Sequence, residues 1–233
     1  MGASPNNEDA VRCAESAYFA LSEDDQRVLV CFAPFTSAVS PTLLDGYLPK
    51  LRSQPALAAF ALSRWTEAIG EARQHGLLRP HPGEPSYLSI PPAVTALLRS
   101  RPEFSAHAET RLAIDTAFRE VYWEFTEVMH MMFQSTISDF QLSARDVVCL
   151  EHDNIVMAMD IALSHRVAVE MYCSAIYHSS SMTGHRARGL ELAQRVASRL
   201  EEYPPEDLAG RAGDTCAGDL RRFESVVGSA AAS

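Results

Sequence analysis

Glu127 and His130 are the first residues whose types and spacing could support chemistry. They lie three positions apart in a stretch with helical periodicity, which puts a carboxylate and an imidazole on one helical face. Di-iron helical bundles use this Glu-x-x-His spacing, but they need it twice, together with further glutamates. No second Glu-x-x-His occurs in the chain. We therefore expect no metal site here, but a helix edge that packs against a neighbour.

The other candidate catalytic groups also lack the partner residues that their chemistry requires. Glu151, His152 and Asp153 are consecutive, and adjacent residues on a helix do not face one another. Lys50 is the only lysine and no glycine loop precedes it, which excludes a phosphate-binding loop that ends in Gly-Lys-Ser/Thr. The five cysteines contain no Cys-x-x-Cys pair, as is typical of buried, reduced thiols. We predict that the chain is not an enzyme and holds no cofactor.

Charge and hydropathy narrow the choice of partners. The formal net charge is −10, and a surface of that sign repels phosphate backbones and anionic lipid. No stretch approaches the roughly 20 apolar residues of a membrane span. Residues 1–7 have neither the basic start nor the apolar run of a secretory signal. We expect a cytoplasmic protein that does not bind membranes and does not depend on nucleic acid.

The first hundred residues predict short helices and one small ribbon. Ser22 and Ser40 stand at helix N-cap positions, and Gly76 stands where a helix ends. Two short strands follow, joined by a proline-rich turn and confined by their prolines to a sheet edge. The expected helices cover residues 9–21, 23–33, 42–51, 54–76 and a short stretch after Pro91, and the expected strands cover 77–80 and 86–90.

The rest of the chain contains no strand signal. Helical periodicity predicts a long helix over residues 109–132 and a second over 144–162 with a break near His152. Further helices are expected over 167–182 and 185–200, followed by an amphipathic stretch over 206–227. The composition therefore changes near residues 100–105. We predict one domain over 8–100, a helical domain over 106–227 and a disordered tail over 228–233.

The order of these elements resembles a known class of signalling proteins. Residues 21–29, then Gly76-Leu77-Leu78, then residues 87–91 resemble the winged-helix segment of STAND signalling ATPases, which include the NB-ARC proteins. The later helices are similar to the tetratricopeptide-like array that follows that segment. Residues 150–163 resemble a recurring helix start in such arrays, and Gly184 resembles an inter-helix turn. The resemblance covers about residues 21–200.

The resemblance implies a fold and a role. It implies a mainly α protein, with a winged-helix-like unit carrying a small β-hairpin, followed by a tetratricopeptide-like antiparallel helical array. In the family this part senses a ligand or partner and restrains the ATPase switch. The nucleotide-binding domain is absent from this sequence, and Ile90 occupies the place of the histidine that contacts nucleotide. The chain is then a piece of a longer switch protein or a derivative without the switch.

We predict that a protein or peptide partner binds the helical half. Stacked helix pairs leave a concave face on which partners bind, and aromatic side chains with a polar tip are favoured at interfaces. The oligomeric state is not determined by the sequence. The predicted partner-binding residues are Arg119, Tyr122, Tyr172, Tyr177 and His178.

Two other classes of function remain open. A winged helix often binds DNA, and the recognition helix would then cover residues 54–74, with Arg64 and Arg73 on it and Arg52 just before it. Glu67 and Glu71 partly cancel this charge. A metal-binding helical enzyme is the second alternative, and it would need Glu127 and His130 in a pocket beside other carboxylates.

Overall fold

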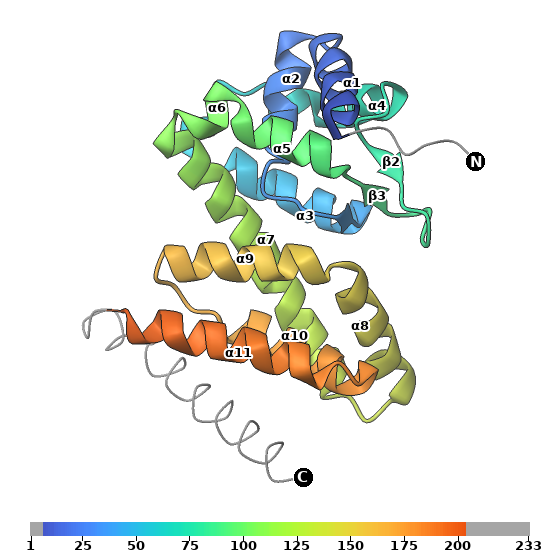
Figure 1. The fold of residues 1–233 in the computed structure, drawn as a ribbon, viewed down its shortest axis with the longest axis vertical. Coiled ribbons are helices and arrows are strands. Elements are labelled where there is room, and N and C mark those ends of the chain that lie inside the picture. Colours follow the sequence, from blue (N-terminus) through green and yellow to red (C-terminus); the bar gives the residue numbers. More distant parts are fainter. Residues whose placement is uncertain (1–6, 204–233) are drawn as a thin grey trace. The chain divides into compact units, whose positions relative to one another are not determined.

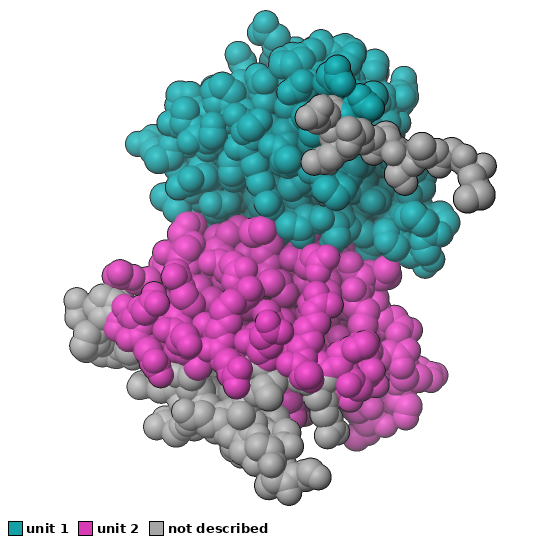
Figure 2. Space-filling view, in the orientation of Figure 1, with its two compact units in different colours: residues 1–121 teal, residues 122–233 magenta. Residues whose placement is uncertain are grey.

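The computed structural model describes residues 7–203 and divides into two compact units, residues 1–121 and 122–233 (Figure 2). The division falls inside helix α7 (Ala108–Phe133), whereas the sequence placed the domain boundary near residues 100–105. The first half of α7 belongs to unit 1 because Phe118 packs edge-on against Phe35, with ring centroids 4.8 Å apart, and against Tyr47 at 6.4 Å.

Unit 1 is a set of short helices with one small sheet (Figure 1). Single-turn 3₁₀ helices occupy Pro55–Leu57 and Leu62–Arg64. The helices and strands, in chain order, are α1 (Asn7–Phe19), α2 (Glu23–Val30), β1 (Ala38–Val39), α3 (Pro41–Arg52), α4 (Trp65–Gln74), β2 (Arg79–Pro80), β3 (Leu88–Ser89), α5 (Pro92–Ser100), α6 (Pro102–Ser105) and the first half of α7.

The predicted pairing of two strands is confirmed, but the expectation that both lie at a sheet edge is wrong for β3, because a third strand pairs with its other side. Strand β2 pairs antiparallel with β3, with Arg79 opposite Ser89. Strand β1 pairs with the other side of β3, with Ala38 opposite Ser89, so the strand order is β1-β3-β2. Strand β1 is only two residues long, too short to show the alternation by which a strand is recognised in a sequence.

Local end signals were predicted correctly in unit 1. The hydroxyls of Ser22 and Ser40 accept hydrogen bonds from the backbone N–H groups of Asp25 (3.2 Å) and Leu43 (3.1 Å). Gly76 has a φ of 72°, the left-handed conformation that a glycine adopts after a helix.

The helix predicted from residue 54 was wrong in its first half, because α4 begins only at Trp65. A continuous helix would place Leu57 and Leu62 about 140° apart around its axis. The two 3₁₀ turns and the bend between them bring both leucines into the core, where Leu57 is 1% and Leu62 6% exposed.

Aromatic rings fill the core of unit 1. Phe32 stacks on Trp65 with centroids 5.0 Å apart, and Phe35 lies 5.4 Å from Tyr47. The Tyr47 hydroxyl, buried among these rings, donates to the carbonyl of Cys31 at 2.8 Å. The polar end of the tyrosine is therefore satisfied without water.

Unit 2 is built around helix α10 (Glu170–Thr183). The other helices are the second half of α7, α8 (Ser138–Leu150), α9 (His152–Ser164) and α11 (Arg186–Glu201), and α10 packs against each of them. The predicted break near His152 is confirmed, since Glu151 alone separates α8 from α9. Gly184, with φ 78°, ends α10 as expected. The predicted stretch over 206–227 and the tail over 228–233 lie outside the described residues.

Between residues 7 and 203, none of the helices has both the length and the apolar character needed to traverse a lipid bilayer.

Candidate interaction surface of unit 2

Tyr122 lies in the interior of unit 2 and not at its surface. Its hydroxyl donates to a carboxylate oxygen of Glu151 at 2.8 Å, and the Asn154 amide donates to the same oxygen at 2.9 Å. All three side chains are 0% exposed. The expectation that Tyr122 contacts a partner therefore needs correction, because the tyrosine stabilises a buried carboxylate at the junction of α8 and α9.

Tyr172 is also buried, at 0% exposure, so it too cannot reach a partner in this structure. Its ring meets Trp123 edge-on, with centroids 5.6 Å apart. Trp123 is half-buried, and its indole N–H donates to Glu127 at 3.0 Å. Sequence periodicity placed these aromatic residues on helices but could not say which face each helix buries, and the face carrying Tyr122 and Tyr172 is the buried one.

Tyr177 and His178 are half-buried on α10. His178 stacks on Phe133 with centroids 5.2 Å apart, and its ring lies 6.2 Å from that of His130. Burial lowers the pKa of His178, and the neighbouring His130 lowers it further. His178 is therefore neutral at neutral pH and acts as a packing residue between α7 and α10.

Arg119, the remaining predicted residue, is half-buried in unit 1. Its guanidinium lies 3.9 Å from the carboxylate of Glu120, its neighbour in the chain. An ion pair at that distance between partly exposed groups contributes little to stability.

Glu127 and His130 have different hydrogen-bond partners. Glu127 accepts from Trp123, whereas His130 Nδ1 lies 2.8 Å from the Ser174 hydroxyl on α10. Among residues 7–203 no group of three or more His, Cys, Asp or Glu side chains is placed to hold a metal ion. The pair fits the helix edge that the sequence predicted.

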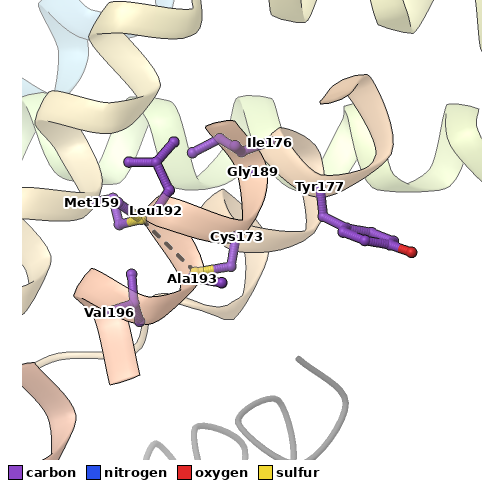
Figure 3. A pocket seen from close by; sticks show the side chains of 8 residues that line it. All are labelled: Met159, Cys173, Ile176, Tyr177, Gly189, Leu192, Ala193 and Val196. Atoms are coloured by element: carbon purple, nitrogen blue, oxygen red, sulfur yellow. Dashed lines mark hydrogen bonds between the residues drawn. The ribbon is translucent and has the colours of Figure 1, made fainter. Parts of the chain in front are cut away.

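A small pocket opens between α9, α10 and α11, with a cavity volume of about 10 Å³ (Figure 3). Small-molecule sites occupy about 300–1,000 Å³ and contain convergent polar groups. Here the Cys173 thiol faces the Met159 sulfur at 3.8 Å, and the Tyr177 hydroxyl points away from the other labelled side chains. The lining is apolar: Met159, Cys173, Ile176, Tyr177, Gly189, Leu192, Ala193 and Val196.

Unit 2 instead exposes most of its large apolar side chains in one stretch of the chain. The 128–142 segment is the last turns of α7, the turn after them and the start of α8. It contains five of the eight exposed large hydrophobic residues found between residues 7 and 203. Contiguous exposed apolar patches larger than a few hundred Å² mark interaction sites, and side chains this close in the chain are candidates for such a patch. The five are Val128 (46% exposed), Met131 (64%), Ile137 (51%), Phe140 (49%) and Leu142 (42%).

The turn within this segment is held by polar contacts. The Gln141 amide donates to the carbonyls of Ser135 (2.7 Å) and Phe133 (3.4 Å), and the Ser135 hydroxyl accepts from the backbone N–H of Ile137 at 3.1 Å. These bonds fix the backbone from which Ile137 and Phe140 project, so the apolar groups are presented by an ordered turn.

The sequence pattern could have indicated this segment, but none of the predicted site residues lies in it. The end of α7 carries Phe125, Val128, Met129, Met131, Met132 and Phe133, which is more apolar character than one helix face can bury. A surface helix normally confines its apolar residues to one stripe. Met129 and Phe133 are buried, and Val128 and Met131 project on the opposite side.

In unit 1 two of the three arginines proposed to read DNA, Arg64 and Arg52, form hydrogen bonds within the protein. Arg64 donates two hydrogen bonds to Asp25, both 3.0 Å long, and Asp25 is 2% exposed. The Arg64 guanidinium lowers the pKa of the Asp25 carboxyl, and Ser22 adds to that effect. Arg52 donates to the carbonyl of Leu62 at 3.3 Å. Arg73 is the remaining arginine of this set.

No protein-family model, curated protein or solved structure matches the chain. The functional assignment therefore depends on the side chains described above.

Proposed function

We propose that the chain is a non-catalytic protein-interaction module of the sensor or adaptor kind, which binds its partner through the 128–142 segment. The observation that carries the proposal is the exposure of Val128, Met131, Ile137, Phe140 and Leu142 within fifteen consecutive residues. Leaving such side chains in water costs free energy that a partner recovers by covering them. Their turn is hydrogen-bonded and so presents them in a defined arrangement.

We further propose that unit 1 is winged-helix-like and akin to the corresponding segment of STAND proteins. Its order of helix, strand, helix, helix and two strands supports this, as does the strand order β1-β3-β2. Gly76 and the two leucines after it precede β2, as in the resembling motif. Ile90 is 2% exposed and apolar, so it packs in the core and does not contact a nucleotide.

The tetratricopeptide-like array of unit 2 stays a prediction. Helices α8 and α9, separated by one residue, are the part closest to a helical repeat pair. In a stacked array each repeat contacts only its neighbours, whereas α10 contacts α7, α8, α9 and α11. The proposed partner site does not depend on an array, because it lies at the α7–α8 turn.

DNA binding by unit 1 is the second candidate, and the order of its elements is what favours it. Helix α4 would be the recognition helix, but it carries Glu67 and Glu71 beside Arg73. The bidentate bond to Asp25 keeps Arg64 from a phosphate. DNA binding predicts a retarded duplex band at low salt, and the absence of any shift would remove this candidate.

A selection experiment tests the proposed function. A peptide library would be selected on the intact chain and counter-screened on a Met131→Glu/Phe140→Glu variant. We expect ligands that bind the wild type and lose at least about tenfold in affinity on the variant. Leu112→Glu is the matched control, since Leu112 is 52% exposed on the unit 1 half of α7. Ligands that ignore the double variant, or no ligands at all, would contradict the proposal.

A further inference from the structure

Carboxylates accompany the exposed apolar residues of unit 2. Between Tyr122 and Ala144 the chain has three carboxylates and no lysine or arginine. Glu124 and Glu127 lie on the same exposed face of α7 as Val128 and Met131, and Asp139 is exposed between Ile137 and Phe140. The Glu127 carboxylate is held in place by the Trp123 indole N–H at 3.0 Å. The 128–142 segment and the turn of α7 before it therefore combine exposed apolar side chains with exposed carboxylates.

The apolar part of the segment is adaptable. Met131 is its most exposed member, and Met132 on the next position is half-buried. Methionine is unbranched and polarizable, so it adjusts its shape to different apolar partners. Surfaces of this kind bind amphipathic helices, whose apolar face is covered while their polar face stays in water.

Charge decides among the occupants that could cover this surface. A second copy of the chain would bring Glu124, Glu127 and Asp139 against the same carboxylates, and like charges brought together oppose association. The chain's own residues 204–233 contain five carboxylates against three arginines, so that segment is also net negative. Neither occupant complements the acidic groups.

We propose that the occupant is a cationic amphipathic segment of another protein, with a stripe of apolar side chains flanked by lysine or arginine. Its apolar stripe covers Met131, Phe140 and their neighbours, and its cations lie against Glu124, Glu127 and Asp139. This inference rests on the proposed function, since it names the chemistry of the partner that the same surface binds.

The test uses three synthetic helical peptides of roughly 18 residues, or five turns. All three have the same leucine stripe, and their polar face is lysine, glutamine or glutamate. Binding to the intact chain is measured by fluorescence anisotropy at low and high salt. The lysine peptide should bind at least about tenfold more tightly than the glutamine peptide and lose that advantage at high salt, because salt screens exposed charges. The glutamate peptide should bind most weakly.

Variants then locate the bound peptide. Met131→Gln/Phe140→Gln should weaken the lysine peptide by about tenfold or more, since central apolar anchors dominate such interfaces. Glu124→Gln/Asp139→Asn should weaken it several-fold and reduce the salt dependence. Leu112→Gln is the matched control and should change nothing. All these positions are exposed, so the variants should fold.

Three outcomes would overturn the inference. Equal binding of the three peptides, with sensitivity to Met131→Gln/Phe140→Gln, would remove the charge preference but leave the interaction surface standing. Self-association of the wild type that Met131→Gln/Phe140→Gln abolishes would assign the surface to a second copy. Failure of all peptides would remove a helical cationic partner, and the library selection above would then decide separately whether the surface binds any peptide.

Discussion

Units 1 and 2 differ in which polar and apolar side chains they bury and which they expose. Within residues 7–203, unit 1 exposes two large hydrophobic side chains, Phe19 and Leu112, whereas unit 2 exposes six. Unit 2 in turn contains five of the seven buried polar residues found in residues 7–203: Thr126, Glu151, Asn154, Ser179 and Ser180. Unit 1 contains the other two, Asp25 and Thr95.

The side chains that stabilise each unit are therefore distinct from the side chains that it exposes at its surface. The ring cluster of Phe32, Phe35, Tyr47, Trp65 and Phe118 stabilises unit 1 by burial of apolar surface. In unit 2 polar groups also enter the interior, where the buried Glu151 accepts hydrogen bonds from Tyr122 on α7 and Asn154 on α9. The apolar groups that unit 2 leaves outside are then available to a partner.

The two tryptophans allow the comparison to be measured. Trp65 lies in unit 1 and Trp123 in unit 2, and the chain has no others. Unfolding of unit 1 can be followed by Trp65 fluorescence in a Trp123→Phe background, and unfolding of unit 2 by Trp123 fluorescence in a Trp65→Phe background.

Phe35→Ala should have the largest effect on stability. The ring contacts Phe32 at 5.5 Å, Tyr47 at 5.4 Å and Phe118 at 4.8 Å, and its removal leaves a cavity. We expect the free energy of unfolding of unit 1 to fall by about 3–5 kcal/mol, measured by urea denaturation. Leu112→Ala is the control and should stay within about 0.5 kcal/mol. A loss below about 1 kcal/mol for Phe35→Ala would contradict the central role of the ring cluster.

Tyr122→Phe should have the next largest effect, and on unit 2. It removes the hydroxyl that donates to the buried Glu151 at 2.8 Å, and a buried acceptor that loses its donor costs about 1–3 kcal/mol. Tyr47→Phe is the matched comparison in unit 1, because the equally buried Tyr47 hydroxyl donates to the neutral carbonyl of Cys31 at 2.8 Å. We expect about 0.5–1.5 kcal/mol there. Equal losses in the free energy of unfolding, measured by urea denaturation, would show that the hydrogen bond to the buried Glu151 contributes no more than the hydrogen bond in unit 1.

Asp115→Asn should stabilise unit 1 at neutral pH. Burial raises the pKa of Asp115 to about 6, against the opposing effects of Arg111 and Arg99. Below about pH 4 the carboxyl is protonated in both folded and unfolded chains and costs nothing. Between about pH 4 and 6 the unfolded chain releases this proton while the folded protein keeps it, so wild-type stability falls over that window and stays lower above it. We expect a gain of about 1–2 kcal/mol for the variant at pH 7.

The pH dependence is the check on the Asp115 effect. Urea denaturation of unit 1 at pH 4 and pH 7 should show a gap between wild type and variant at pH 7 only. The exposed Asp45 on α3 provides the control variant Asp45→Asn. A gap of the same size at both pH values would mean that the variant acts through packing and not through ionisation.

Met131→Gln and Phe140→Gln should have the smallest effect on folding. Both side chains are about half exposed or more, and surface substitutions away from special features usually stay within about 0.5 kcal/mol. The measurement is urea denaturation of unit 2 through Trp123. A loss above about 1.5 kcal/mol for either variant would show that the 128–142 segment supports the fold, which would weaken its proposed role in binding.

The order of elements in the chain was largely predictable, and the candidate surface was not. Helix ends at Ser22, Ser40, Gly76 and Gly184 were predicted because a cap is a contact among residues a few positions apart. The ribbon of β2 and β3 was predicted for the same reason, from a proline-rich turn between two short apolar runs. The helix expected from residue 54 was wrong, because the need to bury both Leu57 and Leu62 overrode local propensity.

The sequence by itself determined the mainly helical character of the chain, the change of pattern after the ribbon, and the absence of a phosphate-binding lysine loop. Only the tertiary structure decided that Tyr122 and Tyr172 are buried, that Arg64 is bonded to Asp25 39 positions earlier, and that Met131 and Phe140 are exposed. The physical reason is the distance along the chain over which each kind of interaction acts. Caps, turns and periodicity are set by neighbours along the chain, whereas the exposed side of an apolar helix such as α7 depends on which distant helices pack against it.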